Sequence, residues 1–295
     1  MQRRTFIALL GSLAACADAA RAQHPEKTRV ILWVSTEAEP DPFIAGFREG
    51  MKERGYEEGR NLAFVLRYAP GDPAAVQAML PELLTVPADL IVSSGPATRA
   101  MRATAGKPVL FAISGDPVEL GLAESLSRPG RNFTGSTFLS LDLAQKRVQL
   151  LRELLPSVRA LAILSNTTHP GEQAEHDATQ KAADALSVRL AYMPFRSGAE
   201  IDEALARLRA ANADAMLVFP DGVTMVHRAK IADFARAHRL PSMFGWREYC
   251  DAGGCVSYGA SQRATYKRLA VFADRLLKGE SPAELPIEQP TAFEL

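Results

Sequence analysis

The chain has 295 residues, of which 47% are hydrophobic and 23% are charged, so it has the composition of a soluble globular protein and length enough for two domains. Its 34 basic and 34 acidic residues give a formal net charge of zero, which argues against nucleic acid and against an anionic membrane surface as partners. The sequence contains no glycine-rich phosphate loop and no histidine pair at metal-ligand spacing, so we expect no cofactor and no metal site.

The first 22 residues have the features of a secretory signal peptide. Residues 1–4 are basic, residues 6–15 are a short apolar run, and Ala20-Arg21-Ala22 is a small-x-small cleavage site. The paired arginines in the basic start also resemble a twin-arginine export signal. An alternative is a lipoprotein signal, because the segment LAAC resembles a lipobox in which Cys16 would carry the lipid. We favour cleavage after Ala22 and expect a protein of the periplasm.

From residue 29 the chain alternates strand and helix patterns. In the first half, apolar runs predict strands at 29–35, 62–68, 90–93, 109–113 and 133–138. Asp-Pro pairs at 41–42, 72–73 and 116–117 indicate helix starts, because Asp caps a helix and Pro suits its first turn. A shorter helix is expected between Gly95-Pro96 and residue 105. Strands that alternate with helices imply a parallel sheet with right-handed crossovers.

The second half repeats this plan without repeating its residues. Strands are predicted at 161–164, 188–193, 215–219, 241–245 and 256–259, and helices at 143–155, 172–186, 201–211, from Gly222 to His238, and at 263–277. The last of these helices follows a short strand and is placed to return to the first lobe. We therefore expect an α/β fold with two Rossmann-like lobes, each built on a parallel sheet.

Small hydroxyl, glycine and amide groups recur at the carboxyl ends of the predicted strands, where open α/β sheets bind ligands. Beside helix N-termini these groups supply donors for a small anion such as a carboxylate. Two acidic residues can accept hydrogen bonds from an ammonium group, or can be helix caps, and four aromatic residues can line a flat apolar ligand, or can belong to the core. The acidic residues are Asp116 and Asp221, and the aromatic ones are Phe138, Phe244, Trp246 and Tyr258. The candidate ligand-binding residues are Thr36, Ser94, Gly95, Pro96, Ser114, Gly115, Asp116, Phe138, Asn166, Asp221 and Tyr258.

Catalytic chemistry has no clear signal in this sequence. Serines at strand ends lack a Gly-x-Ser-x-Gly elbow, and no nucleophile–base arrangement stands out, so we assign no catalytic residue. His169 and His176 are seven positions apart in a Glu-rich segment, which favours a solvated loop over a metal site. Cys250 and Cys255 flank Asp-Ala-Gly-Gly and can form a local disulfide or remain two thiols; their spacing does not decide between these alternatives.

Several segments, taken together and in order, resemble the periplasmic solute-binding proteins of ABC importers, in the branch that includes tryptophan- and tyrosine-binding members. They are FREGMKERGYEEGRNLAF (47–64), GDPVELGLAESLSRPGRNFTG (115–135), KRVQLLRELLP (146–156), AHRLPSMFGWREYCDAGGCVSYG (237–259) and LPIEQPTAFEL (285–295). The resemblance implies the type I periplasmic binding protein fold, in which three crossing strands join two lobes and one small ligand is enclosed at the hinge. The crossings would be 134–137, the strand around Ser257, and 286–289.

The resemblance also implies the division of the chain. Lobe 1 would comprise 23–137 plus 258–283, and lobe 2 would comprise 138–257 plus 284–295. Relatives continue past Phe-Glu-Leu with a further strand and helix, so the edge of lobe 2 is expected to be incomplete at its C-terminal side. The family's ligand contacts come from strand ends and carry over to seven positions. These are Thr36, Ser94, Gly95, Ser114, Asp116, Asn166 and Asp221.

We expect a monomeric, exported receptor that closes its two lobes around a small organic solute and delivers it to the membrane permease of an ABC importer. The solute class that fits the strand-end groups is an amino acid, or a related carboxylate or aromatic compound. One alternative is a sensor that hands the signal of the bound solute to a membrane receptor. A second is an exported enzyme on the same scaffold, such as a racemase or hydrolase using Asp116 or Cys250, because fold alone does not settle function.

Overall fold

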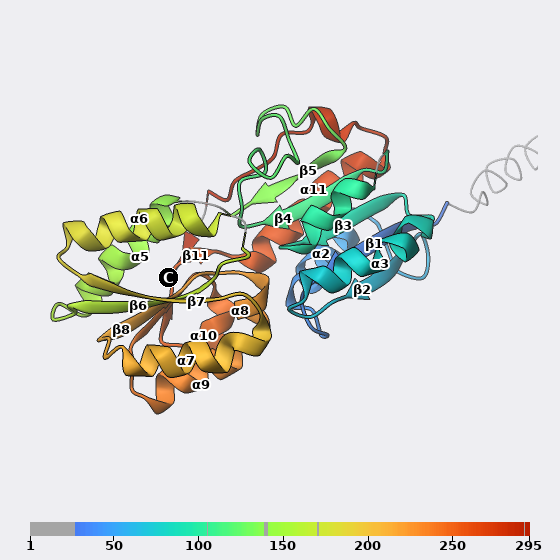
Figure 1. Cartoon of the computed structure of the whole chain (residues 1–295). Helices are drawn as coiled ribbons and strands as arrows, with labels where there is room; N and C mark the ends of the chain where they lie inside the picture. Colours follow the sequence, from blue (N-terminus) through green and yellow to red (C-terminus); the bar gives the residue numbers. More distant parts are fainter. Residues whose placement is uncertain (1–26, 105, 139–140, 170, 292) are drawn as a thin grey trace, which may run out of the picture.

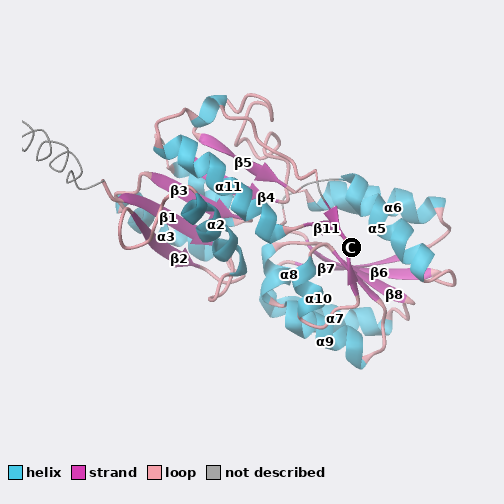
Figure 2. Ribbon diagram, turned by 180° about the vertical axis from the view of Figure 1, so that it is seen from behind, coloured by secondary structure: helices cyan, strands magenta, loops and turns pink. Residues whose placement is uncertain are grey.

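The computed structural model describes residues 27–104, 106–138, 141–169, 171–291 and 293–295, which form two α/β lobes side by side (Figures 1 and 2). The predicted signal peptide, with its twin-arginine start and Cys16, lies outside the described residues. Each lobe is built on a five-stranded sheet in which every strand pairs in parallel with its neighbours. The two-lobed α/β fold expected from the sequence is confirmed.

The sheet of lobe 1 has the strand order β2-β1-β3-β4-β5. Its strands are β1 (Arg29–Ser35), β2 (Leu62–Tyr68), β3 (Leu90–Ser94), β4 (Val109–Ile113) and β5 (Phe133–Thr137). Side chains alternate between the faces, so Ile31 and Trp33 pack on one side of β1 and Leu32 and Val34 on the other. The three inner strands are buried, as their continuous apolar runs predict.

Two pairs of helices cover this sheet. On one face lie α3 (Pro73–Thr85) and α4 (Ala97–Ala100), the latter continued by a 3₁₀ turn, Met101–Ala103. On the other face α2 (Pro42–Glu53) packs along α11 (Gln262–Leu277). The two helices touch almost backbone to backbone, because a Cβ added at Gly46 would lie 2.7 Å from Arg263 O. The helix at the end of the chain therefore returns to lobe 1, as predicted.

The sheet of lobe 2 has the order β10-β9-β8-β6-β7. Its strands are β6 (Ala160–Asn166), β7 (Arg189–Phe195), β8 (Ala215–Val218), β9 (Ser242–Phe244) and β10 (Val256–Ser257). Helices α5 (Leu141–Leu154) and α6 (Glu172–Ala185) pack together over one face. The opposite face carries α7 (Ile201–Ala210), α8 (Gly222–Val226), α9 (Arg228–Ala237) and α10 (Arg247–Asp251), as Figure 1 shows.

Three chain segments cross between the lobes. The first leads from β5 into α5, and the second from β10 through β11 (Gly259–Ala260) into α11. The third follows a 3₁₀ turn, Pro282–Glu284, and runs beside β5, where Glu288 N donates to Gly135 O at 2.9 Å. It ends in β12 (Phe293–Glu294), which pairs antiparallel with β11. These crossings make the hinge, and the exact division of the chain between lobes stays a prediction.

The structure corrects two predicted helices and adds one. Residues 117–121 form successive turns instead of a helix after Asp116-Pro117, and Gly121 there has a φ of +67°, outside the helical region. The helix expected from Gly222 to His238 is two helices that meet at His227, where α8 ends and α9 begins. Helix α10 was not predicted. Every helix that the structure describes is too short or too polar to span a lipid bilayer.

Candidate functional site

The carboxyl ends of the lobe 1 strands bring buried polar groups to the face that meets lobe 2. Thr36 and Glu37 follow β1 directly and are 1% and 2% exposed. Ser94, at the end of β3, donates a hydrogen bond from Oγ to Ser35 Oγ at 2.9 Å. Gly95 comes next with a φ of +53°, a left-handed conformation that turns the chain away from the sheet. Thr36, Ser94 and Gly95 thus lie together at the carboxyl ends of the neighbouring strands β1 and β3, as their positions in the sequence predict. Pro96 is buried beside them.

Lobe 2 presents Asn166, His169, Asp221 and Trp246, all buried and all at or just after strand ends. Asp221 caps α8: its Oδ1 accepts from Thr224 N at 2.9 Å, while its backbone N–H donates to Thr224 Oγ1 at 3.1 Å. This capping box uses one carboxylate oxygen, and the other, Oδ2, makes no hydrogen bond of good geometry, although the side chain of Asn166 acts on the carboxylate and lowers its pKa. Asp221 is therefore a helix cap and still has an acceptor free to meet another group.

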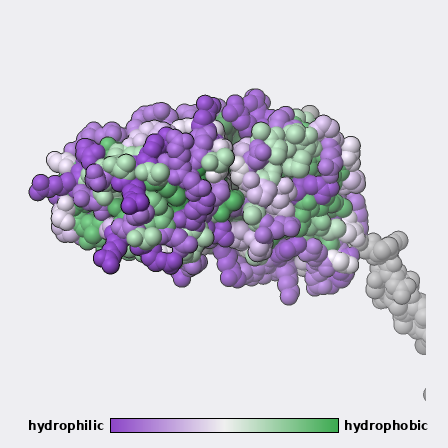
Figure 3. Space-filling view, turned by 60° about the horizontal axis from the view of Figure 1, so that its bottom comes forward, coloured by the Kyte–Doolittle hydropathy of each residue, from purple (hydrophilic) through white to green (hydrophobic). Residues whose placement is uncertain are grey.

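The two faces are in contact in this structure. Ser114 Oγ of lobe 1 is hydrogen-bonded to His169 Nε2 of lobe 2. A Cβ added at Gly222 would lie 2.8 Å from Thr36 Oγ1 and 3.4 Å from Glu37 Oε1, so the start of α8 touches the end of β1. Figure 3 shows hydrophilic residues over much of both lobes, with hydrophobic residues visible near the boundary between them. The lobes are thus closed on each other.

Between the lobes, the described residues enclose a small cavity of about 10 Å³, which we call the interlobe cavity. Its lining comes from both lobes and from two crossing segments: Ser114, Phe138, Leu143, Arg147, Glu175, Pro220, Trp246 and Ala260. The volume is about that of one water-sized probe. Protein side chains therefore fill the gap that the sequence predicted, and a solute can enter only if the lobes separate.

Buried polar atoms without a hydrogen-bond partner gather at the strand ends and helix starts that meet between the lobes. Among the described residues, such atoms are Asn166 Nδ2, His169 Nδ1, Asp221 Oδ2, Glu248 Oε2, both amide atoms of Gln262, and Arg48 Nε. Arg48 Nε is the exception, since it lies outside this region, 3.1 Å from Glu58 Oε2. Buried polar groups in folded proteins nearly always have partners, so a cluster without them indicates a place prepared for a ligand or ordered water.

A buried ion pair lines the same cavity. Arg147 on α5 lies 3.0 Å from Glu175 on α6, and the two side chains are 5% and 8% exposed. Arg147 Nε also donates to the backbone oxygen of Tyr258 at 2.8 Å, which ties α5 to the second crossing segment. Burial raises the pKa of Glu175 to about 7, although the Arg147 charge acts to lower it. Neither residue was predicted, because both lie within helices and not at strand ends.

Aromatic rings form a continuous wall across the hinge. Phe43 stacks on Tyr266 with ring centroids 4.9 Å apart, both in lobe 1. Trp246 of lobe 2 meets Phe43 edge-on at 6.3 Å and Phe138 of the first crossing segment at 6.1 Å. Of the predicted aromatic residues, Phe138 and Trp246 thus line the site, and the prediction missed Phe43 and Tyr266. Phe43 belongs to the buried apolar side of α2, but its position in the sequence does not show that this ring reaches the other lobe.

Burial dominates the titration of the charged groups at this interface. It raises the pKa of Glu37 well above its usual value, and the nearby Asp41 raises it further. It also raises the pKa of Asp221 to about 7 and lowers that of His169 to about 4. Glu37 was missed by the sequence analysis, although a signal was present: it is a charged residue only two positions beyond the end of the buried strand β1, close to the carboxyl edge of the sheet.

Other predicted residues lie elsewhere or have different partners. Asp116 is partly exposed, and its Oδ1 accepts from Val118 N at 2.7 Å and Glu119 N at 3.3 Å, so its carboxylate caps a turn. The backbone oxygen of the buried Gly115 accepts from Thr137 Oγ1 at 2.8 Å. The remaining predicted aromatic residues are not among those that line the interlobe cavity, and the two described cysteines are unpaired. Phe244 stacks on Tyr249 at 4.9 Å, the Tyr258 ring is 6.2 Å from that of Phe293, and Cys250 and Cys255 are free thiols.

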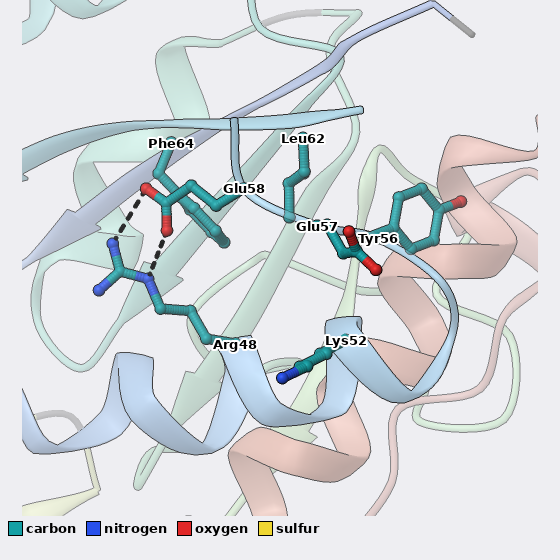
Figure 4. Close-up of a pocket in the computed structure, with 7 residues that line it drawn as sticks. All are labelled: Arg48, Lys52, Tyr56, Glu57, Glu58, Leu62 and Phe64. Carbon is teal, nitrogen blue, oxygen red and sulfur yellow. Dashed lines mark hydrogen bonds and ion pairs between the residues drawn. The ribbon is translucent and has the colours of Figure 1, made fainter. Parts of the chain in front are cut away.

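A roomier pocket lies on the outer side of lobe 1, between α2 and the chain before β2, and we call it the outer pocket (Figure 4). It has a volume of about 450 Å³ and is lined by Arg48, Lys52, Tyr56, Glu57, Glu58, Leu62 and Phe64. Arg48 pairs with Glu58 at 3.1 Å, and its guanidinium lies 5.1 Å from the centre of the Phe64 ring. Three of its charged groups thus already have partners, since Arg48 pairs with Glu58 and Glu57 with Arg60, and all of them stay partly exposed to water.

Comparison with known proteins matches nearly all of the described chain. Residues 27–295 match the family model of the ABC transporter substrate binding proteins. A tyrosine-binding protein of Clostridioides difficile strain R20291 is 23% identical over 250 residues, which cover 84% of this chain and 71% of that protein.

Three solved structures share the fold. A conserved domain protein of Vibrio cholerae O1 biovar El Tor superposes with a TM-score of 0.84 at 23% identity, over 91% of both chains. An ABC domain from Streptococcus pneumoniae, in complex with L-Trp, gives a TM-score of 0.81 at 22% identity over 90% of both chains. The ligand-free, open structure of a substrate-binding protein with adhesive properties from Clostridium difficile gives 0.62 at 20% identity, over 90% of this chain and 91% of that one. At these identities the likeness shows the fold.

Proposed function

Because the chain belongs to the ABC transporter substrate-binding protein family, we propose that it is the exported solute receptor of an ABC import system and that its solute is an aromatic amino acid or a closely related compound. In this proposal the signal peptide at 1–22 exports it to the periplasm, where it works as a monomer. There it delivers the solute to a membrane permease.

The observation that carries the proposal is the cluster of unpaired polar atoms between the lobes. Asn166, Asp221 and Gln262 each bury at least one atom that has no partner. Leaving a buried donor or acceptor unsatisfied costs about 1–3 kcal/mol per group. A polar solute that met these atoms would remove that cost, so the closed arrangement without solute is less stable than the closed complex.

This difference in stability is what couples binding to closure. The interlobe cavity, at about 10 Å³, is too small to admit a solute, so binding must begin from an open form. Contacts such as the one between Ser114 and His169 exist only when the lobes meet. A solute that binds the closed form better than the open one shifts the population toward closure. The three crossing segments are the hinge about which the lobes would turn.

The lining of the site supports the solute class. The rings of Phe138, Trp246 and Tyr266 offer flat apolar surface of the kind that stacks against an aromatic side chain. The buried cation Arg147 and the hydroxyl of Ser114 on the cavity wall suit a carboxylate. The relatives named for tyrosine and crystallised with L-Trp point to the same class.

Binding can be tested directly. The exported protein, purified without denaturation, should carry a small solute that native mass spectrometry identifies. After its removal, isothermal titration should give micromolar or tighter affinity for L-tryptophan or L-tyrosine and much weaker affinity for sugars. Binding of a sugar with no response to aromatic amino acids would overturn the solute class. Loss of solute import in cells that lack the protein, restored by the chain only when residues 1–22 are present, tests export and delivery.

A further inference from the structure

Two carboxylates from opposite lobes meet at the closed interface, and neither has a full set of partners. Glu37 is 2% exposed, and within the described part of the chain its carboxylate makes no hydrogen bond and no ion pair. Asp221 is 1% exposed, and its Oδ2 makes no hydrogen bond of good geometry, with the side chain of Asn166 as the nearby group that acts on the carboxylate. A buried, unpaired carboxylate is costly, so two of them on facing surfaces need an explanation.

The geometry puts these groups beside each other. A Cβ on Gly222 would lie 3.4 Å from Glu37 Oε1, and Gly222 is the residue that follows Asp221. The charges that act on Glu37 are mostly negative: Asp41 from its own lobe, and Asp221 and Glu248 from the other. Arg228 is the one positive charge among them. Closing the lobes without a solute therefore brings negative charges together in a place that water cannot screen.

We infer that Glu37 and Asp221 form a split cation site, which closure of the lobes completes and which a primary ammonium group of the solute occupies. The inference rests on the proposed function and names the group by which the solute is selected. Among the described residues no three histidine, cysteine or acidic side chains converge as metal ligands do. An ammonium group, with three N–H donors, needs fewer carboxylates than a metal ion and can reach both lobes at once.

The charge requirement makes the amino group decisive for affinity. A solute without it would bury Glu37 and Asp221 against each other with no counter-charge. Sites built to hydrogen-bond a solute group reject the analogue that lacks it by a large factor, because their own polar groups are left unpaired. We expect indole-3-propionate to bind at least about a hundredfold more weakly than L-tryptophan, although the two have the same ring and carboxylate.

The experiment measures the ratio of these two affinities by isothermal titration in the wild-type protein and in two variants. Glu37→Gln removes one charge of the pair and keeps its size, and it should lower the ratio by about tenfold or more, the effect of a charged hydrogen bond. Glu58→Gln, in the outer pocket, is the matched control and should leave the ratio unchanged. Equal binding of L-tryptophan and indole-3-propionate, or a wild-type ratio in Glu37→Gln, overturns the split cation site and leaves the proposed function standing.

A second measurement needs no solute and so separates the two ideas. In the closed form burial raises the pKa of Glu37 and brings that of Asp221 to about 7, and in the open form water lowers both. The closed empty protein therefore binds more protons, and acidification favours closure. Three further carboxyls act on this pair or near it, Asp41, Glu248 and Glu175, and burial raises the pKa of each, so they add to the protons taken up on closure. Tyr249 and Tyr266 stay neutral because burial raises their pKa. His169 stays neutral in both forms above about pH 6.5.

Small-angle X-ray scattering should therefore show the empty protein contracting as the pH falls from about 8.5 to about 6.5. Glu37→Gln should already be more contracted at about pH 8.5 and should contract less as the pH falls, because only Asp221 of the pair then titrates. A radius of gyration that does not change in the wild type, or that changes alike in both proteins, overturns the split cation site. If no aromatic solute binds in the first experiment, the proposed solute class fails and this measurement alone decides the inference.

Discussion

The outer pocket and the interlobe cavity differ in size and in the state of their polar groups. The outer pocket offers about 450 Å³, and its Arg48 has both an ion pair and an aromatic ring as partners. The interlobe cavity offers about 10 Å³, yet Asn166, Asp221 and Gln262 around it bury unpaired atoms. A pocket whose polar groups already have hydrogen-bond partners contributes little binding free energy to a ligand. A small cavity lined by unpaired polar atoms contributes more, because the ligand supplies the missing hydrogen bonds. Buried polar atoms without hydrogen bonds therefore favour the interlobe region over the larger outer pocket as the binding site.

The largest expected effect is on the free energy of unfolding, and it distinguishes the buried ion pair of lobe 2 from the exposed ion pair of the outer pocket. Arg147→Met should lower the free energy of unfolding by about 3–5 kcal/mol, because it leaves Glu175 buried without its cation. Arg48→Met removes an exposed pair and should cost about 1 kcal/mol or less. Urea unfolding of both variants measures the difference, and similar losses would contradict it.

The pH dependence sharpens this test. Burial raises the pKa of Glu175 to about 7, so its carboxyl is mostly neutral in the folded protein below that value. A raised pKa gives stability that is present at low pH and lost as the pH rises through the folded-state value. The Arg147→Met loss should therefore be larger at about pH 8 than at about pH 5. A loss that does not depend on pH would show that the pair matters through packing alone.

Replacing Asp221, which caps α8 and also belongs to the proposed cation site, should have the next largest effect. Asp221→Ala should reduce the affinity for an aromatic amino acid by about 1.5–3 kcal/mol, through loss of a charged hydrogen bond, and stability by about 1 kcal/mol, through loss of the α8 cap. Asp221→Asn keeps an oxygen that can cap, so it should lose affinity with little loss of stability. Titration calorimetry and urea unfolding measure the two effects separately, and an unchanged affinity in both variants would remove Asp221 from the site.

Closure itself can be blocked by one methyl group. Gly222→Ala would put a Cβ 2.8 Å from Thr36 Oγ1, which should weaken binding by about 1–3 kcal/mol, the usual cost of overpacking, without weakening either lobe. The double variant Gly222→Ala, Thr36→Ala relieves the contact and should recover part of the affinity. Scattering on the solute-saturated proteins should show the single variant more extended than the wild type; a fully closed single variant would contradict this prediction.

The hydrogen bond between Ser114 and His169 predicts a smaller effect, confined to acid. In the closed form burial lowers the pKa of His169 to about 4, and in the open form it should return toward its usual value. A lowered pKa gives closure a stability that is present above about pH 6.5 and lost as the pH falls toward 4. Affinity should therefore fall more steeply with acid in the wild type than in His169→Gln. Parallel pH profiles of the two proteins would contradict this.

The smallest expected effect concerns Asp116, a ligand candidate by sequence. Both of its hydrogen bonds go to the turn that follows it. Asp116→Ala should therefore change the solute affinity by less than about 0.5 kcal/mol, as surface substitutions away from a site usually do. Titration calorimetry checks this, and a tenfold loss would restore Asp116 as a ligand residue.

Local sequence patterns predict most of the strands and helices and about half of the residues at the candidate site. Continuous apolar runs such as 109–113 predict buried parallel strands, and the strand-end rule finds Thr36, Ser94, Asn166 and Asp221, because parallel strands bring their carboxyl ends to one edge. The helix expected after Asp116-Pro117 is wrong because capping residues also begin turns. The cap signal acts over three or four residues, and it does not show whether a helix continues.

What the sequence determined by itself is therefore the alternation of strands and helices, the two lobes, the family and the polar strand ends, since each depends on neighbouring residues or on an ordered set of motifs. Only the tertiary structure decided which groups meet across the interface. Glu37 and Asp221, or Arg147 and Tyr258, are more than a hundred residues apart in the chain, and no spacing rule connects them. Their partners, their burial and the resulting pKa shifts follow from how two separately folded sheets turn toward each other about the hinge.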